Sequence, residues 1–326
     1  MSGLKLDIGF QGRIAIALVL AVGLCITIPG FASIATAASV FENVGLIALI
    51  GTGIMLTMVV GQLDLSIASV AAVAAIIALK IAGVSLLLGV LVALGVAIVY
   101  GAAIGYVIGR TGINSMVLTV CTLIGLRGLA LVMAPQRPAI LPGGLFWLSD
   151  ALVTRMGPVT VLGLIGIGVV AIIGLLMRCT TTGLSMYAVG GHSERARGSG
   201  VNTTRVYMVA FAGSAVLGAL AGILAAVRSG SASGLGFESF LLAGITAAVV
   251  GGVPLEGGRG TVVNVLIGAF IIRLISTAVS LGGIAGSFES IVIGGILLAM
   301  LLLDYWLRQR GGSRSGPRRT FNQTAF

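Results

Sequence analysis

The chain has very few ionisable residues. Charged side chains make up 9% of its 326 residues, the single histidine is His192, and the lysines are Lys5 and Lys80. No Ser/His/Asp constellation surrounds this histidine in the sequence pattern, which argues against nucleophilic catalysis. Neither lysine follows a glycine, so the Gly-Lys-Ser/Thr of a phosphate-binding loop is absent. We therefore expect a protein that is not an enzyme, does not hydrolyse ATP by that route and binds no cofactor itself.

Cysteine is also scarce, and basic charge is unevenly placed. Cys25, Cys121 and Cys179 lie in or beside different apolar runs, so they indicate neither a disulfide framework nor a metal site. The net charge of +10 owes much to arginines after residue 307. Positive charge beside apolar spans is typical of the cytoplasmic face of a membrane protein. We expect membrane lipid around the chain and no nucleic-acid partner.

Apolar residues and glycine are abundant instead. Apolar residues make up 58% of the chain, and runs such as 86–108 and 159–177 contain no charge. About 18 uncharged apolar residues are enough to cross the hydrocarbon core as a helix. The 51 glycines would weaken soluble helices, but they let membrane helices approach closely. The composition predicts an all-α, polytopic membrane protein.

The apolar runs predict about ten transmembrane helices in one domain, residues 1–307, followed by a basic, disordered tail, 308–326. Glycines or polar residues interrupt the spans at 43–61, 66–83 and 241–257, which are therefore expected to be broken or re-entrant. The first run has the form of a signal peptide, but the apolar pattern continues, so we favour a retained span. The predicted spans are 14–34, 43–61, 66–83, 86–109, 114–134, 158–177, 206–227, 241–257, 260–281 and 288–306.

The distribution of basic residues predicts the orientation of these spans. With ten spans, most lysines and arginines fall on the side of the N-terminus, and Lys80, Arg137, Arg155 and Arg228 fall on the other side. Both termini are therefore expected in the cytoplasm of a multi-pass inner-membrane protein. The polar segment 134–157 would face outward, and 178–205 would be the longest cytoplasmic connection.

Glycines recur at intervals of four residues, at 101, 105 and 109 and again at 218 and 222. This is the small-xxx-small pattern of closely packed membrane helices. A sliding interface is the functional alternative, and we favour simple packing.

Several polar residues lie within or between apolar runs. Ionisable groups at membrane depth are functional candidates by default. For Asp64 we favour a helix cap, whose carboxylate binds free N–H groups of the next helix. For Arg127 and Arg273 a structural partner or snorkelling is as good an interpretation as function. The candidates for the translocation pathway or a structural role are Gln62, Asp64, Ser66, Thr119, Thr122, Arg127 and Arg273.

The cytoplasmic segment contains a short charged stretch with glycine on both sides. Ser193 is expected to cap a short helix there, and Glu194 suits its first turn. Such an element, projecting from the membrane, can dock a partner protein. The candidate docking residues are Gly190, Gly191, His192, Ser193, Glu194, Arg195, Ala196, Arg197 and Gly200.

Four motifs in this order carry a resemblance. Val-Gly-Gln-Leu-Asp-Leu-Ser-Ile-Ala-Ser at 60–69 is similar to Gly-Gly-Ile-Asp-Leu-Ser-Val-Gly-Ser, and 190–201 is similar to Gly-Gly-Asn-x-x-Ala-Ala-x-x-Ser-Gly-Ile. The segments 118–130 and 251–260 supply the other two motifs. Over roughly residues 40 to 305, the chain resembles the ribose/xylose/arabinose-type permease subunits of bacterial ATP-binding cassette importers. Glutamine at 62, histidine at 192 and proline at 254 depart from the family pattern.

This resemblance implies that several different subunits carry out transport together. Two permease chains, identical or different, would form the pathway, and separate ATPase subunits carrying ATP and Mg²⁺ would grip the cytoplasmic loop. An extracytoplasmic sugar-binding protein would deliver a monosaccharide or sugar-like solute. An ATP-binding cassette permease for nucleosides or branched-chain amino acids remains an alternative. A second alternative is an ion-coupled secondary carrier, in which Asp64 and Arg127 would lie near the midplane. A membrane-bound enzyme or receptor has no catalytic cluster or soluble domain to support it.

Overall fold

The computed structural model describes residues 8–135, 137–283 and 287–312. Within them the chain is mostly helical, with four two-residue strands. The elements are α1 (Ile8–Thr27), α2 (Ile34–Val59), α3 (Ile67–Ile81), α4 (Leu86–Thr111), α5 (Ser115–Met133), β1 (Ala139–Ile140), η1 (Gly143–Leu145), α6 (Phe146–Val153), β2 (Arg155–Met156), β3 (Val159–Thr160), α7 (Val161–Cys179), α8 (Thr181–Gly191), α9 (Ser193–Gly198), α10 (Thr203–Ser229), β4 (Ser231–Ala232), α11 (Glu238–Gly251), α12 (Val262–Leu281) and α13 (Ser287–Gly312). This arrangement confirms the all-α polytopic class.

Seven of the described helices are long and apolar enough to cross a membrane, namely α1, α2, α4, α5, α7, α10 and α12. The shorter α3 and α11 have 15 and 14 residues. At 1.5 Å per residue, each is only about 21–23 Å long, less than a hydrocarbon core of about 30 Å. The interruption expected in 241–257 is confirmed, because α11 ends at Gly251 and the left-handed Gly252 follows. In 66–83 the helix α3 is short but unbroken, so no interruption lies within it. The helix count differs from the predicted ten.

The interruption expected within 43–61 was wrong. The helix α2 runs unbroken from Ile34 to Val59, because its glycines lie against neighbouring backbones and not in a bend. A Cβ atom on Gly45 would lie 3.0 Å from the Cα of Gly163, and one on Gly53 would lie 3.2 Å from the carbonyl oxygen of Ser214. These glycines allow close approach of helices.

The first and last helices end at other residues than the predicted spans. The first helix ends at Thr27, before Pro29 and the left-handed Gly30, and Ser33 then caps α2. At the other end, α13 continues to Gly312, so residues 308–312 of the expected disordered tail are helical. The rest of that tail, 313–326, lies outside the described residues.

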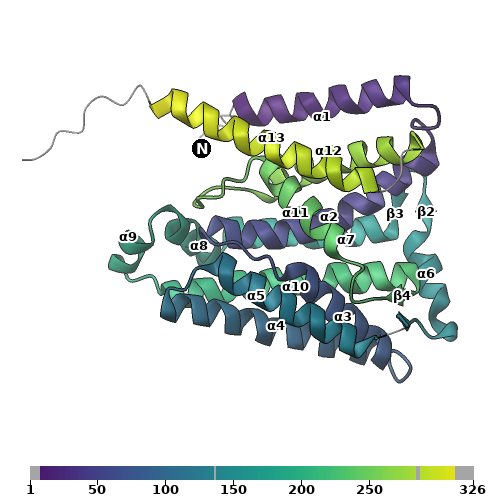
Figure 1. The fold of residues 1–326 in the computed structure, drawn as a ribbon, viewed down its shortest axis with the longest axis horizontal. Helices are drawn as coiled ribbons and strands as arrows, with labels where there is room; N and C mark the ends of the chain where they lie inside the picture. The colour runs from purple at the N-terminus through teal and green to yellow at the C-terminus, as the bar shows by residue number, and fades with distance from the viewer. Residues whose placement is uncertain (1–7, 136, 284–286, 313–326) are drawn as a thin grey trace, which may run out of the picture.

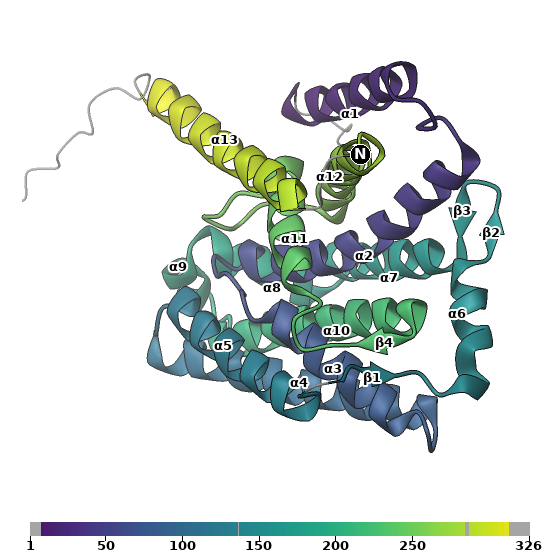
Figure 2. The same cartoon turned by 45° about the vertical axis from the view of Figure 1, so that its right-hand side comes forward.

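The helices form a bundle with two distinct ends (Figure 1). The short helix α9 projects at one end, where α1 begins and α13 finishes, and α6, β2 and β3 lie at the opposite end. We call these the α9 end and the β end. At the β end, β1 pairs antiparallel with β4, and β2 pairs with β3. Turning the molecule shows α1 at the margin of the bundle, where it packs on α12 (Figure 2).

The core lies where α10 packs against α2, α3 and α4. Glycines make these contacts close. A Cβ atom on Gly105 would lie 2.5 Å from the carbonyl oxygen of Tyr207, and one on Gly218 would lie 2.9 Å from that of Ile67. All five glycines of the pattern lie at close contacts between helices: Gly101, Gly105, Gly109, Gly218 and Gly222.

Candidate functional site

An extended stretch joins α2 to α3. We call residues 61–66 the extended segment; it begins at Gly61, whose φ of +74° favours glycine. Asp64 lies within it and is 1% exposed. The Asp64 Oδ1 atom accepts hydrogen bonds from the Ser66 backbone N–H at 2.9 Å and the Ser66 hydroxyl at 2.6 Å. Its Oδ2 atom accepts one from the Ser214 hydroxyl at 2.8 Å.

This geometry is close to the capping hypothesis but differs from it in detail. The N-cap residue of α3 is Ser66, and its own side chain makes no capping bond. Asp64, two residues before Ser66, accepts the hydrogen bond from the Ser66 backbone N–H instead. It also joins the start of α3 to α10 through Ser214, a residue that no motif singled out.

The N-terminal turns of α5 line the other side of the extended segment. Leu63 N–H donates to the Ser115 hydroxyl oxygen, and Leu65 N–H donates to that of Thr119, both at 3.2 Å. The Thr119 hydroxyl donates to the Leu63 carbonyl oxygen at 3.3 Å. Two extended residues advance about 6.6 Å and four helical residues about 6 Å, so the two spacings match. Side chains of α5 thus satisfy main-chain groups that no regular structure pairs.

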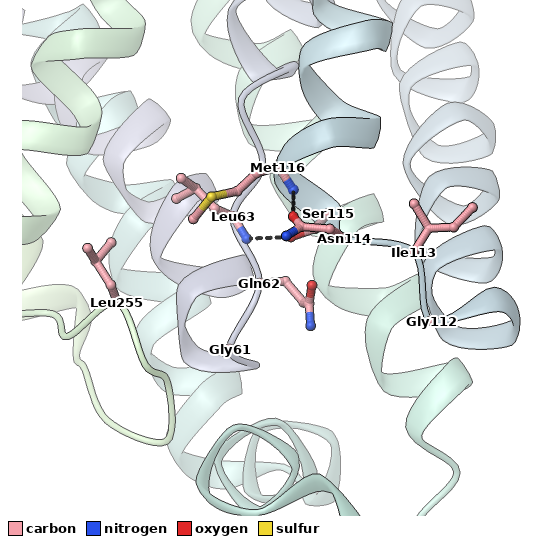
Figure 3. Close-up of a pocket in the computed structure, with 9 residues that line it drawn as sticks. All are labelled: Gly61, Gln62, Leu63, Gly112, Ile113, Asn114, Ser115, Met116 and Leu255. Carbon is pink, nitrogen blue, oxygen red and sulfur yellow. Dashed lines mark hydrogen bonds between the residues drawn. The ribbon is translucent and has the colours of Figure 1, made fainter.

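A cavity of about 370 Å³ lies beside the contact between the extended segment and α5 (Figure 3). Its polar side chains are Gln62, Asn114 and Ser115. The Asn114 side-chain Oδ1 atom accepts a hydrogen bond from the Met116 N–H at 2.9 Å. The lining contains no charged residue and consists of Gly61, Gln62, Leu63, Gly112, Ile113, Asn114, Ser115, Met116 and Leu255.

The sequence candidates separate into several groups. Gln62, Asp64, Ser66 and Thr119 lie together at the extended segment. Thr122 lies one turn further along α5, where its hydroxyl oxygen accepts from the Tyr100 hydroxyl at 2.9 Å.

The two intramembrane arginines lie elsewhere. Arg127 pairs with Glu238 at 2.9 Å, and the two side chains are 43% and 55% exposed. Arg273 lies within electrostatic range of an ion pair between Arg228 and Glu42. Glu42 is almost fully buried, and it was missed because its position in α2 follows no motif.

The helix α9 is short and almost wholly exposed; of its side chains Ala196 alone is buried. Glu194 lies in its first turn, with Arg195 and Arg197 in the last, an order that suits the helix dipole. The expectation for Ser193 was wrong, because His192 is the N-cap residue and makes no side-chain capping bond. The other candidates of this segment flank α9: Gly191 and Gly200 are exposed, and Gly190 is packed against Val59.

No group of three or more His, Cys, Asp or Glu side chains among the described residues could hold a metal ion.

The comparisons with known proteins cover most of the chain. A family model described as "Branched-chain amino acid transport system / permease component" matches residues 36–301. The chain belongs to this family of importer permeases. The permease is 30% identical over 305 residues to the ribose import permease protein RbsC of Haemophilus influenzae, covering 91% of this chain and 94% of the relative.

Two further relatives are named for different solutes. The permease is 31% identical to the L-arabinose transport system permease protein AraH of Escherichia coli, over 90% of this chain and 89% of the relative. It is 30% identical to the autoinducer 2 import system permease protein LsrC of Photorhabdus luminescens, over 85% of this chain and 83% of the relative. No solved structure matches the permease significantly. Its relatives and its apolar helices make it a multi-pass inner-membrane transport subunit.

Proposed function

We propose that the permease is the membrane-spanning subunit of an ATP-binding cassette importer that carries a monosaccharide or sugar-like solute into a bacterial cell. One observation carries this proposal. Relatives named for ribose and arabinose match about nine-tenths of the chain and of their own lengths. The similarity therefore includes the extended segment, the cavity and α9 together.

The chemistry of the cavity supports a neutral solute. An amino acid carries an ammonium and a carboxylate group, and burying either without an opposite charge is costly. The cavity offers the amides of Gln62 and Asn114 and the hydroxyl of Ser115, with no charged residue in its lining. Such groups suit the hydroxyls of a sugar. This argues against the branched-chain amino acid alternative that the description of the family model raises.

The environment of Asp64 argues against an ion-coupled carrier. A coupling carboxylate must exchange a proton or ion with the pathway. Both Asp64 oxygens accept hydrogen bonds from serine donors, and the side chain is fully buried. We assign Asp64 a structural role in holding the start of α3 against α10.

The partners follow from the two ends of the bundle. We place the α9 end in the cytoplasm, together with both termini, so that α9 docks an ATPase subunit that holds ATP and Mg²⁺. A solute-binding protein would dock at the β end. A second permease chain, identical or different, would complete the pathway.

Reconstitution tests the solute class. The permease is placed in proteoliposomes with its ATPase and binding-protein partners, and ATP is enclosed with the ATPase. We expect binding-protein-dependent uptake of radiolabelled D-ribose or L-arabinose and none of L-leucine. Uptake of L-leucine instead would contradict the proposal, as would sugar uptake that persists without ATP and collapses with the proton gradient.

A variant of α9 tests the docking assignment. The double variant Glu194→Ala/Arg195→Ala removes charged side chains that are exposed, so it should leave insertion intact. We expect at least a tenfold loss of co-purified ATPase and of ATP-driven uptake. The matched control is Arg155→Ala, an exposed arginine at the β end, which should retain the ATPase. Normal ATPase binding by the double variant would show that α9 is not part of the docking interface.

A further inference from the structure

Three segments of the chain meet through glycines next to α9. The Gly258 N–H donates to the Val59 carbonyl oxygen at 2.8 Å. A Cβ atom on Gly190 would overlap that same oxygen, and one on Gly257 would lie 2.7 Å from the Gly61 nitrogen. The end of α2, the end of α8 and the loop after α11 therefore touch backbone to backbone. We call the contacts among Val59, Gly61, Gly190, Gly257 and Gly258 the glycine junction.

A side-chain hydrogen bond reinforces this junction. The Tyr187 hydroxyl donates to the Gly260 carbonyl oxygen at 2.7 Å. Tyr187 and Gly190 are three residues apart on α8, so they share one face of the helix. Burial raises the pKa of the Tyr187 hydroxyl above its usual value, so it keeps the proton that it donates at physiological pH. The loop after α11 is thus held to α8 at two successive points.

The junction lies between α9 and the extended segment. On one side, the N–H of His192 donates to the Ala188 carbonyl oxygen and the N–H of Ala196 donates to that of His192, so α8 and α9 are joined through one residue. On the other side, Gly61 is the first residue of the extended segment, three residues before Asp64. A displacement of α9 at this point would reach Val59 and Gly61 through packed backbone.

We propose that Tyr187 and Gly190 are positioning residues that make α8 and the end of α2 move as one unit, and so carry the movement of α9 to the extended segment. The proposal rests on the proposed function, in which an ATPase subunit grips α9. In it, the glycine junction transmits the movement of α9 to the solute cavity, whose lining includes Gly61 and Leu255.

Another route from α9 runs through the start of α10, which contacts α9. That helix packs on α4 through Gly101, Gly105 and Gly109, where a side chain would collide with the α10 backbone. Packed interiors are bistable and not continuously deformable, so movement along α10 would have to carry α4 with it. The junction involves only helix ends and a loop, and can therefore shift without disturbing this packing.

Two variants test the proposal in the reconstituted complex with its ATPase and binding protein. Gly190→Ala forces the ends of α2 and α8 apart, and Tyr187→Phe removes one hydroxyl without adding volume. The readouts are co-purified ATPase, the rate of ATP hydrolysis, and the amount of radiolabelled D-ribose or L-arabinose imported per ATP. The methyl group of Gly190→Ala would lie against the Val59 carbonyl oxygen and not on α9, so we expect normal docking and hydrolysis in both variants. Sugar imported per ATP should fall about tenfold in Gly190→Ala and about threefold to tenfold in Tyr187→Phe, the scale of one lost hydrogen bond.

Matched controls separate coupling from packing. Tyr207→Phe removes a hydroxyl for which the described residues form no hydrogen bond, and Gly95→Ala adds a methyl group where nothing lies within 4 Å. Both should keep the wild-type ratio of sugar to ATP. Gly101→Ala, at the packed α4–α10 contact, should lower the yield of folded permease while the folded fraction keeps its ratio.

The outcomes are distinct. A lower ratio in Gly190→Ala and Tyr187→Phe, with docking intact, supports the proposal. A wild-type ratio in Tyr187→Phe overturns the role of its hydrogen bond, and loss of ATPase docking in either variant overturns the whole proposal, because the residues would then form the docking surface itself. If Gly190→Ala does not fold, Tyr187→Phe decides. Failure of the wild-type permease to bind any ATPase would instead refute the proposed function.

Discussion

The hydrogen bonds of Asp64 allow a quantitative test of its role. Asp64→Ala leaves three buried donors without their acceptor: the Ser66 N–H, the Ser66 hydroxyl and the Ser214 hydroxyl. An orphaned buried donor costs about 1–3 kcal/mol, and the two hydroxyls can turn to helix carbonyls. We therefore expect a loss of about 3–5 kcal/mol in the free energy of unfolding. Asp64→Asn keeps an oxygen for Ser66 and should lose only about 1–2 kcal/mol.

The assay is reversible unfolding in detergent, with sugar uptake measured on the folded fraction. Asp64→Asn should lower the folded yield more than the apparent affinity for solute. Thr52→Val is the control, since the Thr52 hydroxyl is buried without a hydrogen bond among the described residues and its loss should cost nothing. Equal destabilisation by alanine and asparagine would show that the charge matters and not the hydrogen-bond geometry. A tenfold rise in KM for Asp64→Asn at unchanged stability would place Asp64 in the pathway.

Two further predictions concern packing and charge. Gly105→Ala places a methyl group 2.5 Å from the Tyr207 carbonyl oxygen, so it should cost about 1–3 kcal/mol of unfolding free energy. Gly95→Ala on the same helix adds a methyl group where nothing lies within 4 Å and should be neutral or stabilising. Equal effects of the two variants in thermal unfolding would contradict the close α4–α10 contact. The ion pair of Arg127 and Glu238 is half-exposed, so it should contribute less than about 1 kcal/mol to the free energy of unfolding. A double-mutant cycle with glutamine at both positions measures this contribution. A coupling energy well above that value would mean that the pair is shielded in the assembled importer.

Much of the fold follows from local sequence features. Long apolar runs predicted α4, α5, α7 and α12 to within a few residues, because a helix is the structure that satisfies its own backbone in lipid. The shortness of α3 was also predictable, since Gln62, Asp64 and Ser66 follow a glycine. The error in α2 has a physical reason. A glycine that breaks a helix and one that accepts a neighbouring backbone look the same in a single sequence, and only the facing residue, such as Gly163 for Gly45, distinguishes them.

The candidate site was predictable only in part. Asp64 and Thr119 stand out as polar residues in apolar surroundings, but their partners do not. Ser214 lies 150 positions from Asp64, and no periodicity links the two. Ser115 had a weak signal, because it precedes Thr119 by one helical turn and so shares its face. The junction at Gly190 depends on three backbones meeting, which composition and spacing do not encode.

The strand pair at the β end ties together two connections that are far apart in sequence. Ala139 pairs with Ala232 and Ile140 with Ser231, so the stretch between α5 and α6 is fastened to the stretch between α10 and α11 by main-chain hydrogen bonds. A protein that displaces one of these stretches must therefore displace the other as well. Because the pairing uses no side chains, the residues of this strand pair can differ between related proteins while the pair itself keeps its shape.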